Sequence, residues 1–181
     1  MTCLVVLLSG LLIVFGGVFI VVRSIKIYNR LVKLRALSEE GWGGVMTALK
    51  HRRGLLPKIS KSAVVHAMTP ASEMFRNIDS VHAQWKAARG VEETARVEAS
   101  IGAALAGFKD VVEDHPDLKA DGNIIQILDE LSALEKRIEK TRSYYNATVR
   151  DYNMEMDLFP TKLIAGLMGF KRSAFFDPDA Q

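Results

Sequence analysis

Apolar residues along the chain form one uninterrupted run, followed by stripes at helical spacing. The run extends from Leu4 to Val22 and contains nineteen residues without a charge. As a helix it would be about 28 Å long, close to the thickness of the hydrocarbon core of a bilayer. A cleaved signal peptide is the alternative, but no Lys or Arg precedes the run, the run is longer than a signal core, and no small-x-small cleavage motif follows it. The run therefore predicts a transmembrane anchor over residues 1–22.

The charges around this run predict its orientation. Only the α-amino group precedes it, whereas five basic residues follow it closely: Arg23, Lys26, Arg30, Lys33 and Arg35. By the positive-inside rule, the N-terminus lies outside and the rest of the chain lies in the cytoplasm after a single pass through the membrane. The rule is a statistical bias, so a periplasmic position of the rest of the chain is the alternative.

Beyond Arg23 the apolar residues keep helical spacing, and no stretch shows the alternation or the turn residues of a β-hairpin. The first helix is expected to continue out of the membrane to about His66, with a kink at Pro57. Thr69 and Pro70 are the residue types of a helix start and predict a second helix, to Arg89. Gly90 then interrupts the apolar spacing. It either forms a turn between two helices, which we favour, or is a weak point within one longer helix, which would give three long helices in all.

Two further helices are predicted. One runs from Glu92 to Asp114 and stops before Pro116. The other runs from Asn123 to Asp157, and Asn123 with Gln126 resembles a capping box at its start. We expect the four helices to bury a core along their apolar stripes. The stripe residues are Tyr28, Leu31, Leu34, Trp42, Val45, Leu49, Met74, Ile78, Val81, Trp85, Ala88, Val97, Ile101, Leu105, Phe108, Val112, Ile124, Leu128, Leu131, Leu134, Ile138, Tyr145, Tyr152 and Met156.

The C-terminal segment, residues 159–181, has an amphipathic pattern. Pro160 suits a first helical turn, and the apolar face is expected to contain Leu163, Ile164, Leu167 and Met168. Basic residues flank this face: Lys162, Lys171 and Arg172. The segment is too short to span a bilayer, so it either docks on the helices or lies in the membrane interface.

The amino-acid composition narrows the range of possible functions. The 181 residues are 49% hydrophobic and 25% charged, which is typical of one folded domain with an appendage. The lone Cys3 excludes an internal disulfide framework and a zinc site of the CxxC type. A net charge of +3, without basic residues interleaved with exposed aromatic ones, is too small to indicate nucleic-acid binding.

Candidate chemistry is sparse. The four histidines lack metal-ligand spacing, and the chain contains no P-loop, dinucleotide fingerprint or nucleophile elbow. An acidic stretch from Asp110 to Asp117 could suggest a cation site, but it lacks EF-hand spacing, and a solvated loop is the preferred interpretation. We therefore expect no enzyme activity, no cofactor, no metal, no small-molecule substrate and no nucleic-acid partner.

Three of the four tyrosines are followed by asparagine: Tyr28-Asn29, Tyr145-Asn146 and Tyr152-Asn153. In an antiparallel bundle these pairs should lie together near the membrane. There a tyrosine can bury its ring while its hydroxyl and the neighbouring amide find partners or lipid headgroups. The alternative is that each tyrosine ring simply packs in the core with its hydroxyl at the surface.

Several motifs resemble the LemA family of small bacterial membrane-anchored helical proteins. They are Tyr28-Asn29-Arg30-Leu31-Val32, Leu34-Arg35, Trp42 with Val45, Leu49-Lys50 with Arg52, Leu55-Leu56-Pro57, Pro116-Asp117-Leu118-Lys119-Ala120, Tyr145-Asn146, Asp151-Tyr152-Asn153, Phe159-Pro160, Leu163-Ile164-Ala165, Gly169-Phe170-Lys171 and Phe175-Phe176. The chain departs from the family pattern at Met46, Ala48 and Lys58, which replace polar residues, and in a shorter stretch around Gly90.

The resemblance implies an up-and-down four-helix bundle over residues 23–158 on the anchor, in a family whose activity is not established and some of whose members are associated with magnetosome membranes. It places the chain in the bacterial inner membrane. The function expected is a non-enzymatic interaction or scaffold module; an organiser of membrane shape or composition is the alternative, and a metal-dependent regulator ranks third. The partners expected are the lipid bilayer and an unidentified membrane or membrane-associated protein, including a second copy of this chain. The candidate positions are Tyr28, Asn29, Arg35, Trp42, Pro57, Tyr145, Asn146, Tyr152, Asn153, Phe159, Pro160, Gly169, Phe170 and Lys171.

Overall fold

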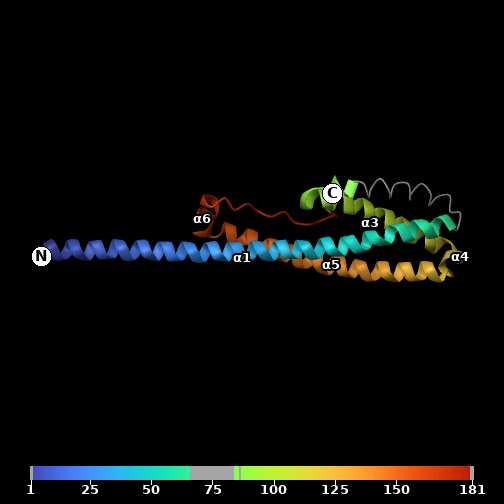
Figure 1. The fold of residues 1–181 in the computed structure, drawn as a ribbon, viewed down its shortest axis with the longest axis horizontal. Coiled ribbons are helices and arrows are strands. Elements are labelled where there is room, and N and C mark those ends of the chain that lie inside the picture. Colours follow the sequence, from blue (N-terminus) through green and yellow to red (C-terminus); the bar gives the residue numbers. More distant parts are fainter. Residues whose placement is uncertain (1, 66–83, 86, 180–181) are drawn as a thin grey trace. The chain divides into compact units, whose positions relative to one another are not determined.

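The computed structural model describes residues 2–65, 84–85 and 87–179, and these residues form helices and connecting segments without a strand (Figure 1). The helices are α1 (Thr2–Val65), α3 (Gly90–Asp114), α4 (Pro116–Lys119), α5 (Gly122–Asp157) and α6 (Thr161–Leu167). The all-α prediction is confirmed. The predicted helix of residues 70–89, with its stripe residues Met74, Ile78 and Val81, lies almost entirely outside the described residues, so the four-helix bundle stays a prediction.

The long helix α1 contains the apolar run and continues for 64 residues. In the described part of the chain it is the one helix long and apolar enough to cross a membrane, and large side chains in its run, such as Leu12 and Ile13, are exposed. This pattern fits a membrane protein. The helix also continues through Pro57, where the lost backbone hydrogen bond is offset by the burial of the neighbouring Leu55, Leu56 and Ile59.

The chain divides into two compact units. The anchor unit contains Met1–Glu39 and Thr148–Ser173, and the core unit contains Glu40–Ala147 and Ala174–Gln181. Both α1 and α5 contribute residues to each unit.

The main hydrophobic cluster lies in the core unit and joins α1, α3, α4 and α5. On α3 the predicted stripe is confirmed, because Ile101, Leu105, Phe108 and Val112 are all buried and Val97 packs against them. The other buried members are Leu55, Leu56, Ile59, Leu118, Ile124, Ile127 and Leu131. The three- and four-residue spacing therefore identified the inward faces of these helices.

Two helices of the core unit begin at residues whose backbone conformation or side-chain hydrogen bonds explain the start. Gly90, the first residue of α3, has φ +79°, a left-handed conformation that favours glycine, and Ala88 and Arg89 before it are non-helical. The helical pattern is therefore interrupted here, whereas the turn between two long helices stays a prediction. The expected capping box on α5 is wrong. The Asp121 carboxylate caps this helix instead, since its Oδ1 accepts hydrogen bonds from the backbone N–H groups of Asn123 at 2.7 Å and Ile124 at 3.2 Å.

The anchor unit has a smaller cluster that joins α1 to α5 and α6. Ile27 and Leu31 of α1 are buried there with Tyr152 of α5 and Ala165 of α6. Leu34, Met156, Ile164 and Phe170 pack against this cluster. Arg30 Nε adds an ion pair to Glu155 Oε2 at 2.7 Å. One face of α6 is therefore docked on α1 and α5.

Candidate interaction site

The second Tyr-Asn pair of α5 holds the backbone of the chain's own C-terminal tail, which we define as residues 171–179. In the anchor unit, Tyr152 Oη donates a hydrogen bond of 2.9 Å to the Lys171 carbonyl. The Asn153 amide bonds both backbone groups of Ser173: Nδ2 donates to its carbonyl at 2.9 Å and Oδ1 accepts from its N–H at 3.0 Å. Asn153 thus pairs with Ser173 as a neighbouring strand would.

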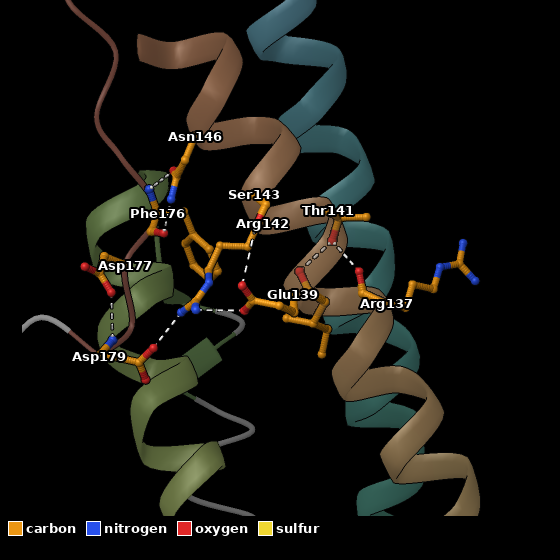
Figure 2. Close-up of polar contacts among 10 residues, drawn as sticks. Arg137, Glu139, Thr141, Arg142, Ser143, Asn146, Phe176, Asp177 and Asp179 are labelled. Atoms are coloured by element: carbon orange, nitrogen blue, oxygen red, sulfur yellow. Dashed lines mark hydrogen bonds and ion pairs between the residues drawn. The ribbon is translucent and has the colours of Figure 1, made fainter.

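The first Tyr-Asn pair repeats this arrangement within the core unit. Tyr145 Oη donates to the Ala174 carbonyl at 2.7 Å. Figure 2 shows the Asn146 amide facing the Phe176 backbone, with both hydrogen bonds 2.9 Å long. Burial raises the pKa of Tyr145 to about 12 and also raises the pKa of Tyr152, because the charged phenolate is disfavoured away from water.

The two pairs make the same kind of contact, each within its own unit. All six hydrogen bonds involve tail backbone and none involves a tail side chain. We call these four side chains the tail brace.

An aromatic contact fixes the tail in the core unit. Phe176 is 0% exposed, and its ring lies 5.5 Å from the ring of Trp42, edge-on. The Trp42 ring is also 5.3 Å from the ring of Tyr145. Beyond Phe176, Arg142 forms ion pairs with Asp179 at 2.5 Å and with Glu139 at 2.7 Å, which raises the pKa of Arg142 (Figure 2).

A family model matches most of the chain, including this part of the structure. The model of the LemA family matches residues 41–181, which include Trp42, the tail brace and the whole tail. The chain belongs to the LemA family.

Individual relatives match over a shorter stretch. Two magnetosome proteins of Paramagnetospirillum magneticum, MamQ 1 and MamQ 2, are each 32% identical to the chain over 79 residues, and MamQ of Magnetospirillum gryphiswaldense is 28% identical over 79 residues. The aligned part is 44% of this chain and 29% of each relative. The chain thus spans less than a third of the length of these relatives.

The candidate interaction positions predicted from the sequence are divided between the two units. Tyr28, Arg35, Gly169 and Phe170 line a groove in the anchor unit, where the Tyr28 and Phe170 rings are 5.7 Å apart and Arg35 pairs with Glu39 at 2.9 Å. Gly169 has φ +72°, which only glycine adopts readily, just after the end of α6.

The three Tyr-Asn pairs are divided between the two units, and their expected grouping near the membrane stays a prediction. Tyr28 belongs to the anchor unit with Tyr152, whereas Tyr145 belongs to the core unit. Tyr28 is 43% exposed and Asn29 is exposed, so this pair does not repeat the arrangement of the other two. Pro57 lies within α1 and is exposed. It is far from the residues of the tail brace in the sequence.

The prediction that the apolar residues of the C-terminal segment form a single face of its helix is partly wrong. The helix begins at Thr161, with Pro160 as the residue before it. Ile164 faces the anchor-unit cluster, whereas Leu163, Leu167, Met168 and the preceding Phe159 are exposed. Since Thr161 and Ala165 are the buried residues of α6, small residues and Ile164 form its docked face.

The structure also reveals a buried charged cluster on the inner face of α3, in the core unit. Glu98 is 2% exposed and pairs with Arg52, and its Oε1 accepts a 2.8 Å hydrogen bond from Trp85 Nε1. The Arg53 guanidinium lies 3.3 Å from the centre of the Trp85 ring, and desolvation lowers the pKa of Arg53 against the opposing effect of Glu98. The sequence contains a signal for this cluster. Glu98 is a charged residue three positions before Ile101, and it therefore lies on the same side of the helix as the apolar stripe.

No metal centre is assembled in the described part of the chain. No group of three or more His, Cys, Asp and Glu side chains there could hold an ion, and the acidic residues Asp110, Glu113, Asp114 and Asp117 are exposed. His66 and His82 lie outside the described residues.

Proposed function

We propose that this chain is a non-enzymatic scaffold, anchored in the bacterial inner membrane, that binds the acidic segment of a membrane-associated protein through its core unit. The observation that best supports a scaffold is the tail brace. The polar groups of Tyr145, Asn146, Tyr152 and Asn153 all hydrogen-bond the chain's own tail, so these motif side chains stabilise the fold. Binding would then involve other, exposed side chains.

A groove between α1 and α5 of the core unit offers such side chains. Lys50, His51 and Lys58 line it from α1, and Leu55 and Leu134 give it an apolar floor. Lys58 Nζ bonds Glu130 Oε2 at 3.0 Å, and this contact lowers the pKa of Glu130, the acidic residue that lines the groove. The Lys50 cation that lines the groove favours an acidic partner segment.

Photo-crosslinking in native membranes tests this proposal. A photoreactive residue is placed at His51 in the full chain, and a matched one at Ser100, which is exposed on α3 of the same unit. We expect a reproducible adduct at position 51 that Lys50→Glu weakens, and none at position 100. An adduct with twice the mass of the chain would identify a second copy as the partner. The same adducts at both positions, or none at either, would contradict the proposal.

The compartment of the core unit follows from the charge bias around the anchor and is part of the proposal. In a Cys3→Ser background, a cysteine at Ser100 should be protected from an impermeant maleimide in intact cells and become labelled after lysis. Labelling in intact cells would place the core unit in the periplasm.

A second candidate function is the organisation of membrane shape or composition. It is favoured by the exposed apolar residues of the anchor unit outside the membrane run, and it is in keeping with relatives named as magnetosome proteins. Deformation or lipid sorting in liposomes containing the full chain would support it. Unchanged liposomes with anionic lipid present would contradict it.

A further inference from the structure

The helix α6 exposes apolar side chains on the face opposite its docked one. Leu163 and Leu167 are four residues apart, and therefore on one side of the helix, and are 65% and 84% exposed. The opposite side, with Thr161 and Ala165, is buried in the anchor unit. Phe159, immediately before the helix, is 83% exposed. Large apolar side chains grouped in this way outside a core mark a surface that contacts a partner or a membrane.

The position of α6 along α1 indicates which of these it contacts. α6 packs against Ile27, and the adjoining Phe170 ring contacts Tyr28. Ile27 is five residues beyond Val22, the end of the apolar run, so it lies about 7.5 Å farther along the helix. The polar layer of a bilayer extends about 5–8 Å beyond each face of the hydrocarbon core. With α1 spanning the membrane, α6 is therefore held at headgroup depth.

The charge of the anchor unit supports the same environment. This unit contains nine Lys and Arg against four Asp and Glu, whereas the rest of the chain contains 15 against 17. The net charge of +3 thus combines a basic anchor unit with a slightly acidic core unit. Lys162 and Lys171, on either side of the exposed leucines, are themselves exposed. Basic side chains around an apolar face favour anionic lipid headgroups.

We propose that α6 is a second membrane contact, in which Phe159, Leu163 and Leu167 insert into the headgroup region of an anionic bilayer while Thr161, Ile164 and Ala165 hold the helix on α1 and α5. This contact would fix the tilt and rotation of α1 at its exit from the membrane, because α6 is attached to one side of it. The proposal rests on the anchoring of α1 in the membrane and is independent of the protein partner proposed for the core unit.

Spin-label accessibility in the full chain provides the test. In a Cys3→Ser background, a nitroxide is attached at Leu167→Cys and, as a matched control, at Ile125→Cys, an exposed apolar position of α5 in the core unit. The chain is reconstituted into vesicles of phosphatidylethanolamine and phosphatidylglycerol. We expect the label at position 167 to collide more often with lipid-soluble oxygen than with an aqueous nickel chelate, and the label at position 125 to show the reverse. Lys162→Glu with Lys171→Glu should reduce the difference at position 167.

Each other outcome contradicts the proposal in a recognisable way. Equal accessibility at positions 167 and 125 would mean that α6 faces water, and spin–spin broadening at position 167 that persists in detergent would mean that a second copy covers it. Failure of the chain to float with the vesicles would overturn the anchoring itself. A label at Leu163→Cys repeats the measurement if Leu167→Cys loses its helical circular dichroism.

Discussion

The side-chain amide of Asn146 bonds both the N–H and the carbonyl of Phe176, thirty residues later in the chain, at 2.9 Å in each case. The amide can match a backbone in this way only where the backbone is extended and lies at a fixed distance from α5. Asn153 makes the same contact with Ser173 in the anchor unit, so in each unit one asparagine of α5 holds the tail backbone.

Replacement of Asn146 with alanine should lower the free energy of unfolding by about 1–3 kcal/mol, because two partly buried backbone groups lose their partners. Amide hydrogen exchange should accelerate at Phe176. The control is Asn29→Ala, an exposed asparagine that also follows a tyrosine, for which we expect a change within about 0.5 kcal/mol. Equal effects of the two substitutions would contradict the role of the brace.

The two adjacent phenylalanines of the tail should differ strongly. Phe176 is fully buried against Trp42, so Phe176→Ala should cost about 3–5 kcal/mol in the free energy of unfolding. Phe175 is exposed to about half of its surface, and Phe175→Ala should cost less than about 1 kcal/mol. Urea denaturation of the detergent-solubilised chain measures both values, and similar costs would mean that the tail does not pack as described.

Two substitutions of Tyr152 measure separately what ring burial and the hydrogen bond contribute to the free energy of unfolding. Tyr152→Ala should cost about 3–5 kcal/mol, because a buried ring is removed, whereas Tyr152→Phe should cost about 1 kcal/mol for the bond to the Lys171 carbonyl. Tyr144→Ala, at the exposed tyrosine of the same helix, is the control, with little change expected. A cost below about 1 kcal/mol for Tyr152→Ala would indicate an exposed ring.

Loss of the buried carboxylate at Glu98 should be costly. Glu98→Ala leaves Arg52 and Trp85 without their acceptor, and we expect a loss of about 3–5 kcal/mol in the free energy of unfolding. Glu135→Ala removes the partly exposed partner of Lys109 and should change the free energy of unfolding by less than about 1 kcal/mol. Thermal unfolding followed by circular dichroism would distinguish the two, and equal midpoints would exclude a buried pair.

The raised pKa of Tyr145 predicts loss of stability in alkali. Between pH 10, the ordinary pKa of tyrosine, and about pH 12 the unfolded chain has released the phenolic proton while the folded chain retains it. Since the unfolded state then binds fewer protons, the free energy of unfolding falls as the pH rises through this range. Urea midpoints measured across the range should fall less steeply for Tyr145→Phe. Identical slopes for the two chains would contradict the burial of this hydroxyl.

Local patterns in the sequence were sufficient for the long helices α1, α3 and α5. The apolar run predicted the only described helix able to cross a membrane, and the spacing of Val97, Ile101 and Leu105 predicted the buried face of α3. Gly90 interrupts the apolar spacing in the sequence, and its left-handed conformation in the structure is one that glycine adopts without a steric penalty. The α5 cap was missed, since Asp121 and Asn123 are both good capping residues and only the backbone geometry selects between them.

The sequence by itself therefore determined the long helices that the structure describes, the apolar character of the first of them and the family, because these depend on patterns of residues a few positions apart. Only the tertiary structure decided where the Tyr-Asn pairs bind, that Phe176 closes an aromatic cluster with Trp42, and which face of α6 is docked. The physical reason is distance along the chain. A hydrogen bond from Tyr145 to a carbonyl 29 residues later leaves no periodic trace in the sequence, because its acceptor is a backbone group that every residue carries.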